Sequence, residues 1–113
     1  MDFPTVITAE LDAARAARAA GNEGRARVHA RRAAGIAARM YQAVYFPSGP
    51  RLNGFRHLQH IARDINLPED IRNAAARLTA RVKPDHTLPH DEDPLKDAAL
   101  LVQELLARLP NGD

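Results

Sequence analysis

The chain has 113 residues, of which 45% are hydrophobic and 27% are charged, and its formal net charge is +2 at pH 7. A chain of this length predicts a single domain, residues 1–113, which can bury a core without covalent crosslinks. The absence of cysteine excludes disulfides, thiol nucleophiles and thiolate metal sites.

Five helices and no strand are expected, because apolar residues recur every three or four positions and no stretch alternates apolar with polar residues. The first helix is expected from Pro4 or Thr8 to Ala20, since proline suits a first helical turn and threonine is a capping residue. Asn22 is then expected to cap a second, long helix that runs to Tyr45.

Two prolines and a glycine between Phe46 and Pro50 break the chain. A third helix is expected from about Leu52 to Ile65, because its apolar residues follow a rhythm of three and four positions. This rhythm predicts one core-facing stripe, made of Leu52, Phe55, Leu58, Ile61, Ala62 and Ile65.

A turn at Pro68 leads into a fourth helix, which is expected to end near Val82. The longest loop, residues 83–93, follows it, and a fifth helix is expected from Pro94 to Leu109. Short connections favour sequential antiparallel neighbours. The predicted fold class is therefore all-α, a single up-down bundle of four to five helices.

The second helix is expected to be the central one, because small residues on one side allow close packing of neighbours. That side holds Ala26, Ala30, Ala33, Ala37, Met40, Tyr41 and Val44. Its opposite side mixes arginines with apolar residues, a composition typical of protein–protein interfaces. We therefore expect an interaction surface made of Arg25, Val28, His29, Arg31, Arg32, Gly35, Ile36 and Arg39.

The charges are unevenly distributed along the chain. Residues 1–50 hold seven Arg and Lys against four Asp and Glu, residues 51–83 hold seven against three, and residues 84–113 hold two against seven. A basic nucleic-acid-binding bundle would fit the first two segments. A self-complementary bundle or dimer fits the modest net charge and the acidic last segment just as well. Since no aromatic residues are interleaved with the arginines to stack bases, a protein partner is favoured over nucleic acid.

No pattern in the chain predicts a metal, a cofactor or a nucleophile. His57 and His60 share a helix face, but only Asp64 lies near them as a third ligand. His86 and His90 lie in an acidic loop whose carboxylates suit helix capping better than metal binding. We therefore expect no metal and no cofactor, and a non-enzymatic role is favoured over catalysis.

A cytoplasmic location is expected, because the chain has no apolar run of about 18 residues and its acidic start does not resemble a signal peptide. The 14 arginines against two lysines are typical of a GC-rich bacterial genome.

Two long runs of the chain resemble parts of a known protein family. The run AARAAGNEGRARVHARRAAGIAARMYQAV resembles the first two helices of a HEPN domain, which are joined by a short Gly-Asn-like turn. The run LPEDIRNAAARLTARVKPDHTLPHDEDPLKDAALLVQELLARL resembles its second half, in which a final helix carries a leucine stripe. The resemblance implies a bundle of four to five helices, a homodimer, and a minimal nucleotidyltransferase as partner in a toxin–antitoxin pair.

Some members of the HEPN family are metal-independent RNases that use an arginine and a histidine with four to six residues between them. Arg51 and His57 have this spacing and are the catalytic candidates if the chain cleaves RNA. Leu52 stands where active members carry a polar residue after the arginine. The resemblance therefore implies a non-catalytic binding or regulatory module, with an RNase or a basic nucleic-acid-binding bundle as the alternatives.

Overall fold

The computed structural model of the chain describes residues 3–50, 52–85 and 87–110, which form five helices and no strand. The helices are α1 (Phe3–Ala19), α2 (Glu23–Tyr45), α3 (Gly54–Ala62), α4 (Glu69–Leu78) and α5 (Pro94–Ala107). The expected all-α fold is therefore confirmed. No helix in these residues is long and apolar enough to cross a membrane.

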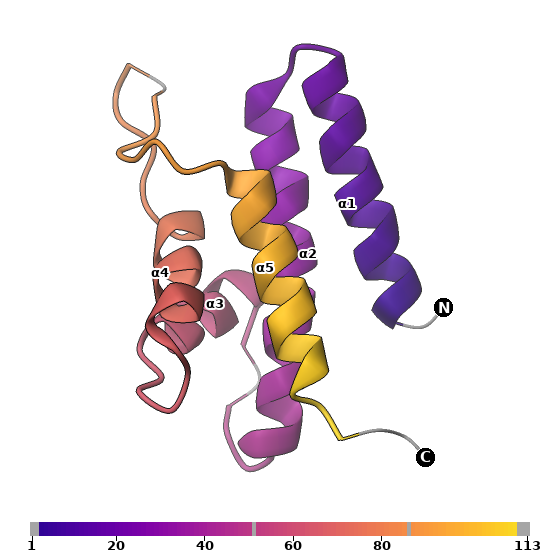
Figure 1. The fold of residues 1–113 in the computed structure, drawn as a ribbon, viewed down its shortest axis with the longest axis vertical. Helices are drawn as coiled ribbons and strands as arrows, with labels where there is room; N and C mark the ends of the chain where they lie inside the picture. Colours follow the sequence, from indigo (N-terminus) through magenta and orange to yellow (C-terminus); the bar gives the residue numbers. More distant parts are fainter. Residues whose placement is uncertain (1–2, 51, 86, 111–113) are drawn as a thin grey trace.

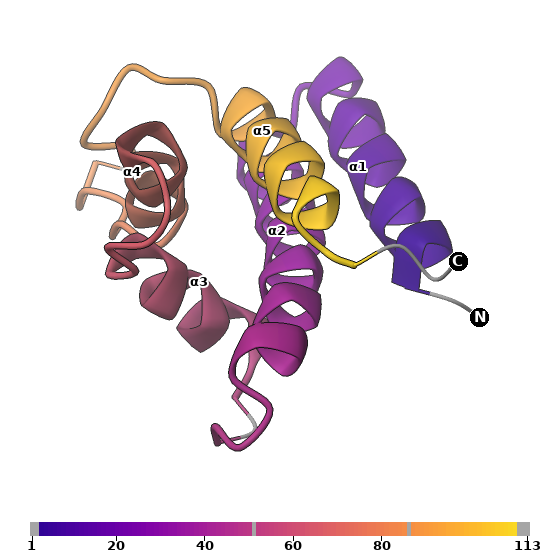
Figure 2. The same ribbon diagram turned by 60° about the horizontal axis from the view of Figure 1, so that its bottom comes forward.

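Helix α2 is the centre of the bundle, as its alanine pattern predicts. It packs against α1, α3 and α5, while α4 packs against α3 and α5. Helix α1 lies on one side of α2 and α5, and α3 and α4 lie on the other (Figures 1 and 2). Helices α1, α2, α4 and α5 run in alternating directions, and the shorter α3 joins α2 to α4 (Figure 1).

The core combines small residues on α2 with large residues on its neighbours. Six alanines of α2 have no exposed surface: Ala26, Ala30, Ala33, Ala34, Ala37 and Ala38. The largest fully buried side chains come from α3, α4 and α5: Leu58, Ile61, Ile71, Leu78, Leu101 and Leu105. Of the expected core face of α2, Val44 is exposed, because the last turn of α2 extends beyond the helices that cover it (Figure 1).

Helix α3 crosses α2 at a contact between two glycines. A Cβ atom added to Gly35 would lie only 2.9 Å from the Cα atom of Gly54. No residue with a side chain fits at Gly35 unless α3 moves, because such short contacts to a backbone atom are repulsive. This contact fixes the distance between α3 and the second half of α2.

Helix α3 is shorter than the sequence pattern predicts, and this changes the position of Ile65. The helix ends at Ala62, where the N–H group of Arg63 donates to the last carbonyl groups. The Asp64 carboxylate then accepts the Asn66 N–H and forms a tight turn. Two of the expected core positions are therefore wrong: Phe55 is 38% exposed, and Ile65, which lies beyond the end of the helix, is 84% exposed.

Two arginines in the interior connect α4 to its neighbours through hydrogen bonds. The Arg77 guanidinium of α4 donates two hydrogen bonds of 2.9 Å to the buried Asp97 carboxylate of α5. Arg27 of α2 is also buried, and it donates to the carbonyl oxygens of Leu78 and Ala80 at the end of α4. A cation at this position satisfies carbonyl groups that the helix itself leaves free. Both contacts hold α4 against the rest of the bundle.

Candidate functional site

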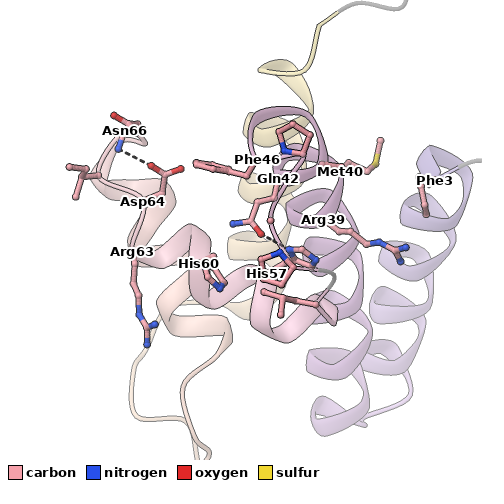
Figure 3. Close-up of a pocket in the computed structure, with 16 residues that line it drawn as sticks. Phe3, Arg39, Met40, Gln42, Phe46, His57, His60, Arg63, Asp64 and Asn66 are labelled. Carbon is pink, nitrogen blue, oxygen red and sulfur yellow. Dashed lines mark hydrogen bonds between the residues drawn. The ribbon is translucent and has the colours of Figure 1, made fainter.

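A groove of about 850 Å³ opens beside the second half of α2. Its walls come from α2, from the segment that follows it, from α3 and from the first turn of α1 (Figure 3). Much of the lining is apolar and includes Phe3, Met40, Phe46, Pro47, Leu52 and Ile65. This volume lies within the range of about 300–1,000 Å³ that is usual for binding sites in proteins.

Three large apolar side chains at this groove are exposed to solvent. The exposed fraction is 84% for Ile65, 51% for Phe46 and 48% for Phe3. Val44 and Tyr45, which directly precede Phe46, are exposed as well. Single exposed apolar residues are ordinary, but a group of them around one concave surface is typical of a binding surface.

The groove also holds cationic side chains that no carboxylate neutralises. Arg39 of α2 lies over the ring of Phe3, with 5.7 Å between its guanidinium carbon and the ring centre. Within the residues that the structure describes, neither Arg39 nor Arg63 has a carboxylate oxygen within 4 Å. His60 lies between these arginines, and Asp64 is the acidic residue of the lining (Figure 3). The groove is therefore apolar and mainly cationic.

His57 forms part of the groove wall, but its imidazole ring is buried, with 6% of the residue exposed. Its Nδ1 atom lies against the Gln42 amide oxygen (Figure 3). Since that oxygen can only accept a hydrogen bond, Nδ1 carries the proton of the neutral ring. The Nε2 atom is buried and has no hydrogen-bond partner among the described residues. Burial lowers the pKa of His57, although the backbone of Leu52 acts in the opposite direction.

The lowered pKa of His57 predicts a loss of stability in mild acid. In the unfolded chain a histidine takes up a proton near pH 6.5, whereas the folded chain binds this proton only at lower pH. As the pH is lowered below about 6.5, the free energy of unfolding should therefore decrease. His57 contributes at most about 1.4 kcal/mol per pH unit to this decrease. Urea unfolding between pH 7 and pH 5 should show a smaller decline for His57→Leu than for the wild type. An equal decline would contradict this role of His57.

The expected interaction surface on α2 is only partly open. Arg25, Arg32 and Arg39 are exposed, whereas Val28, His29, Arg31 and Ile36 are half-buried and Gly35 is buried. The placement of Gly35 on an open face is wrong, because Gly54 of α3 covers it.

Three of the half-buried residues on this surface have partners within the chain. His29 Nδ1 lies 2.7 Å from the Glu10 carboxylate of α1. The guanidinium of Arg31 lies over the Phe55 ring of α3, 5.6 Å from its centre, and Ile36 packs against the core. Of the eight expected residues, Arg39 lines the groove, and Arg25 and Arg32 remain open along the same helix.

The candidate RNase pair cannot be assembled from the structure. Arg51 lies outside the described residues, and the imidazole of His57 is enclosed as given above. No three His, Cys, Asp or Glu side chains among residues 3–50, 52–85 and 87–110 are grouped so that they could hold a metal ion.

Sequence reasoning missed the apolar part of the groove. It placed Ile65 in the core and treated Phe46 only as the start of a break. The polar residues on either side of α3 indicate where the helix begins and ends. Asn53 precedes α3 as its cap, and Asp64 and Asn66 follow it. A shorter third helix would have left Ile65 outside the core. No protein-family model, no curated protein and no solved structure matches the chain.

Proposed function

We propose that the protein is a non-catalytic binding module, and that its groove receives an apolar and acidic surface of a protein chain. The observation that carries this proposal is that three exposed apolar side chains, Phe3, Phe46 and Ile65, line the same groove as the unneutralised Arg39. Apolar anchors within a polar, charged rim are the usual composition of a protein–protein interface.

The enclosure of His57 supports a non-catalytic role. A general acid or base must come within hydrogen-bond reach of the proton that it moves. The exposed surface of its Nε2 atom is below 1 Å², and Gln42 occupies its Nδ1 atom. An RNA 2′-hydroxyl group would reach this histidine only after a movement of the groove wall.

The apolar lining supports a protein partner over nucleic acid. Phosphate recognition needs cations and hydrogen-bond donors, and exposed Arg25, Arg32 and Arg39 could supply them. Ile65 and Phe46 would remain in water in such a complex, whereas a protein surface would cover them. A homodimer and a nucleotidyltransferase partner, as the HEPN resemblance implies, are both compatible with this proposal.

Photo-crosslinking inside the native host cell tests the proposal. Phe46 is replaced with the photoreactive residue p-benzoylphenylalanine, and exposed Ala16 on α1 provides the matched control. The control lies well away from the groove, because α1 rises about 1.5 Å per residue from Phe3. We expect the probe at Phe46 to form an adduct with one protein, identified by mass spectrometry, and the probe at Ala16 to form none.

Two results would overturn the proposal. Equal yields of protein adducts from the two positions would show that the groove has no preferred partner. Adducts with RNA alone would assign the groove to nucleic acid.

A further inference from the structure

Three arginines form a straight row on the open side of α2. Arg25, Arg32 and Arg39 follow one another at intervals of seven residues, and all three side chains are exposed. Residues seven apart in a helix deviate by only about 20° around its axis, and each interval spans about 10.5 Å. The row is therefore about 21 Å long, and its last member, Arg39, lines the groove.

Apolar side chains lie between the arginines of this row. Val28 and Ile36 are half-buried, and Ala43, which follows the row and lines the groove, is exposed. Together with the arginines they form what we call the α2 seam: Arg25, Val28, Arg32, Ile36, Arg39 and Ala43. Its members follow one another at steps of three or four residues, which is the spacing of the contacts that one helix makes when it packs along another.

Neighbouring helices border the α2 seam without covering it. On the side of α1, His29 Nδ1 lies 2.7 Å from the Glu10 carboxylate. On the side of α3, Gly54 packs directly against Gly35. The side chain of Arg39 extends from α2 between these two helices (Figure 3). The open strip of α2 is therefore bounded along its length by α1 and α3.

The charges of the row are not neutralised within the described part of the chain. No carboxylate oxygen of these residues lies within 4 Å of Arg25, Arg32 or Arg39. Glu23, the acidic residue of α2, is paired with Arg18 of α1. A chain that covers the row must bring carboxylates to it, because a cation that is buried without a partner is costly.

A second copy of this protein does not offer such carboxylates on its helices. Within the five described helices, the acids that lie seven residues apart are Asp97 and Glu104 of α5. Asp97 is buried and accepts from Arg77, and Glu104 is paired with Arg108. A helix that matches the row therefore comes from a different protein.

From this arrangement we infer that the partner of the groove is an acidic amphipathic α-helix of a different protein, which lies along the α2 seam with one end in the groove. This inference rests on the proposed function and names the form and the charge pattern of its partner. The helix carries Asp or Glu at successive intervals of seven residues, one for each arginine of the row, and apolar residues between them that cover Val28 and Ile36. Exposed ion pairs contribute little free energy, so the row sets register and orientation and the apolar contacts supply most of the affinity.

The spacing of photo-crosslinks along the partner tests whether it is a helix. Arg25 and Ala43 are replaced, one at a time, with p-benzoylphenylalanine in the native host cell, and the attachment sites are located by tandem mass spectrometry. Both positions are exposed and lie 18 residues apart on α2, a distance of about 27 Å. We expect the two probes to attach to one protein at sites about 18 residues apart, because a partner helix has the same rise, with acids seven residues apart between them.

Other attachment patterns would overturn the inference. An extended partner chain would give sites only about eight residues apart, because a strand rises about 3.3 Å per residue. Attachment to a second copy of this protein, to RNA alone or to a segment without acids at this spacing would also exclude the acidic helix.

Charge reversal tests the row of arginines. The seam variant is Arg25→Glu with Arg32→Glu, and the matched control is Arg81→Glu with Lys96→Glu, which changes the net charge equally at exposed positions after α4 and on α5. Both carry the probe at Ala43. All four replaced side chains are exposed, so both variants should keep the helical circular dichroism and the urea midpoint of the wild type.

We expect the adduct yield of the seam variant to fall at least about tenfold, because like charges then face each other, and that of the control to stay at the level of the wild type. An unchanged yield in the seam variant, or an equal fall in both, would show that the row does not read the charges of the partner.

These results separate the inference from the proposed function. If the probe at Phe46 forms an adduct with one protein, while the probes at Arg25 and Ala43 form none or attach to it without the spacing of a helix, the groove binds a protein and the helix is the wrong partner. If Phe46 gives no specific adduct, both fail.

Discussion

Replacement of Gly35 with alanine is expected to lower the free energy of unfolding by about 1–3 kcal/mol, because the added methyl group overpacks a tight contact. Its Cβ atom would lie 2.9, 3.1 and 3.2 Å from the Cα, C and O atoms of Gly54. These are backbone atoms, so no side-chain rotation can relieve the contact and α3 itself must move. The loss should outweigh the gain of about 1 kcal/mol that alanine gives over glycine inside a helix.

Gly24→Ala on the same helix is the matched control. A Cβ atom at Gly24 has the Asn22 side chain as its nearest neighbour, at 3.9 Å, and should leave stability unchanged or raise it by up to about 1 kcal/mol. Urea unfolding followed by circular dichroism measures both variants. If Gly35→Ala proves as stable as Gly24→Ala, then α3 does not pack on α2 through these glycines, and the wall of the groove is placed incorrectly.

Replacement of Asp97 with alanine is expected to lower the free energy of unfolding by about 3 kcal/mol, because it leaves an uncompensated charge in the interior. Asp97 accepts both hydrogen bonds of Arg77, and these raise the pKa of Arg77 above its usual value. The side chain of Arg77 is itself about one quarter exposed. Because Arg77 keeps this contact with water, the expected loss of unfolding free energy lies at the lower end of the range known for removing one partner of a buried ion pair.

Two further variants distinguish a loss of stability caused by the unpaired buried charge from a loss caused by missing side-chain packing. Glu92→Ala removes the second and more distant carboxylate of Arg77, and should change stability by less than about 1 kcal/mol. The double variant Arg77→Met with Asp97→Leu removes both charges and should be more stable than Asp97→Ala. Thermal and urea unfolding give the comparison. A double variant less stable than Asp97→Ala would contradict this explanation.

The sequence was sufficient to predict the helices and the central position of α2. The alanines of α2 have a helical period, and a face of small residues can be buried only against neighbouring helices, as Ala30, Ala33 and Ala37 are. Asn22 caps α2 through its side chain, and Asp93 caps α5 in the same way. These features are local, and local rules were enough to place them.

The groove could not be predicted because it depends on contacts between distant segments. The period of three and four positions continues from Leu58 to Ile65, yet α3 ends at Ala62 and Ile65 is left in water. Nothing near Gly35 in the sequence indicates that Gly54 will cover it. The sequence near Arg31 likewise does not indicate that α3 will approach it, so an open surface is expected there. In the structure the Phe55 ring of α3 lies beneath the Arg31 guanidinium.

The central claim is that the groove beside the second half of α2 receives a surface of a protein chain, and photo-crosslinking from position 46 tests it most directly. We predict that the probe at Phe46 forms an adduct with one protein, because Phe46 is 51% exposed at the groove, and that the probe at Ala16 forms none. Equal yields of protein adducts from the two positions, or adducts with RNA alone, would contradict the claim.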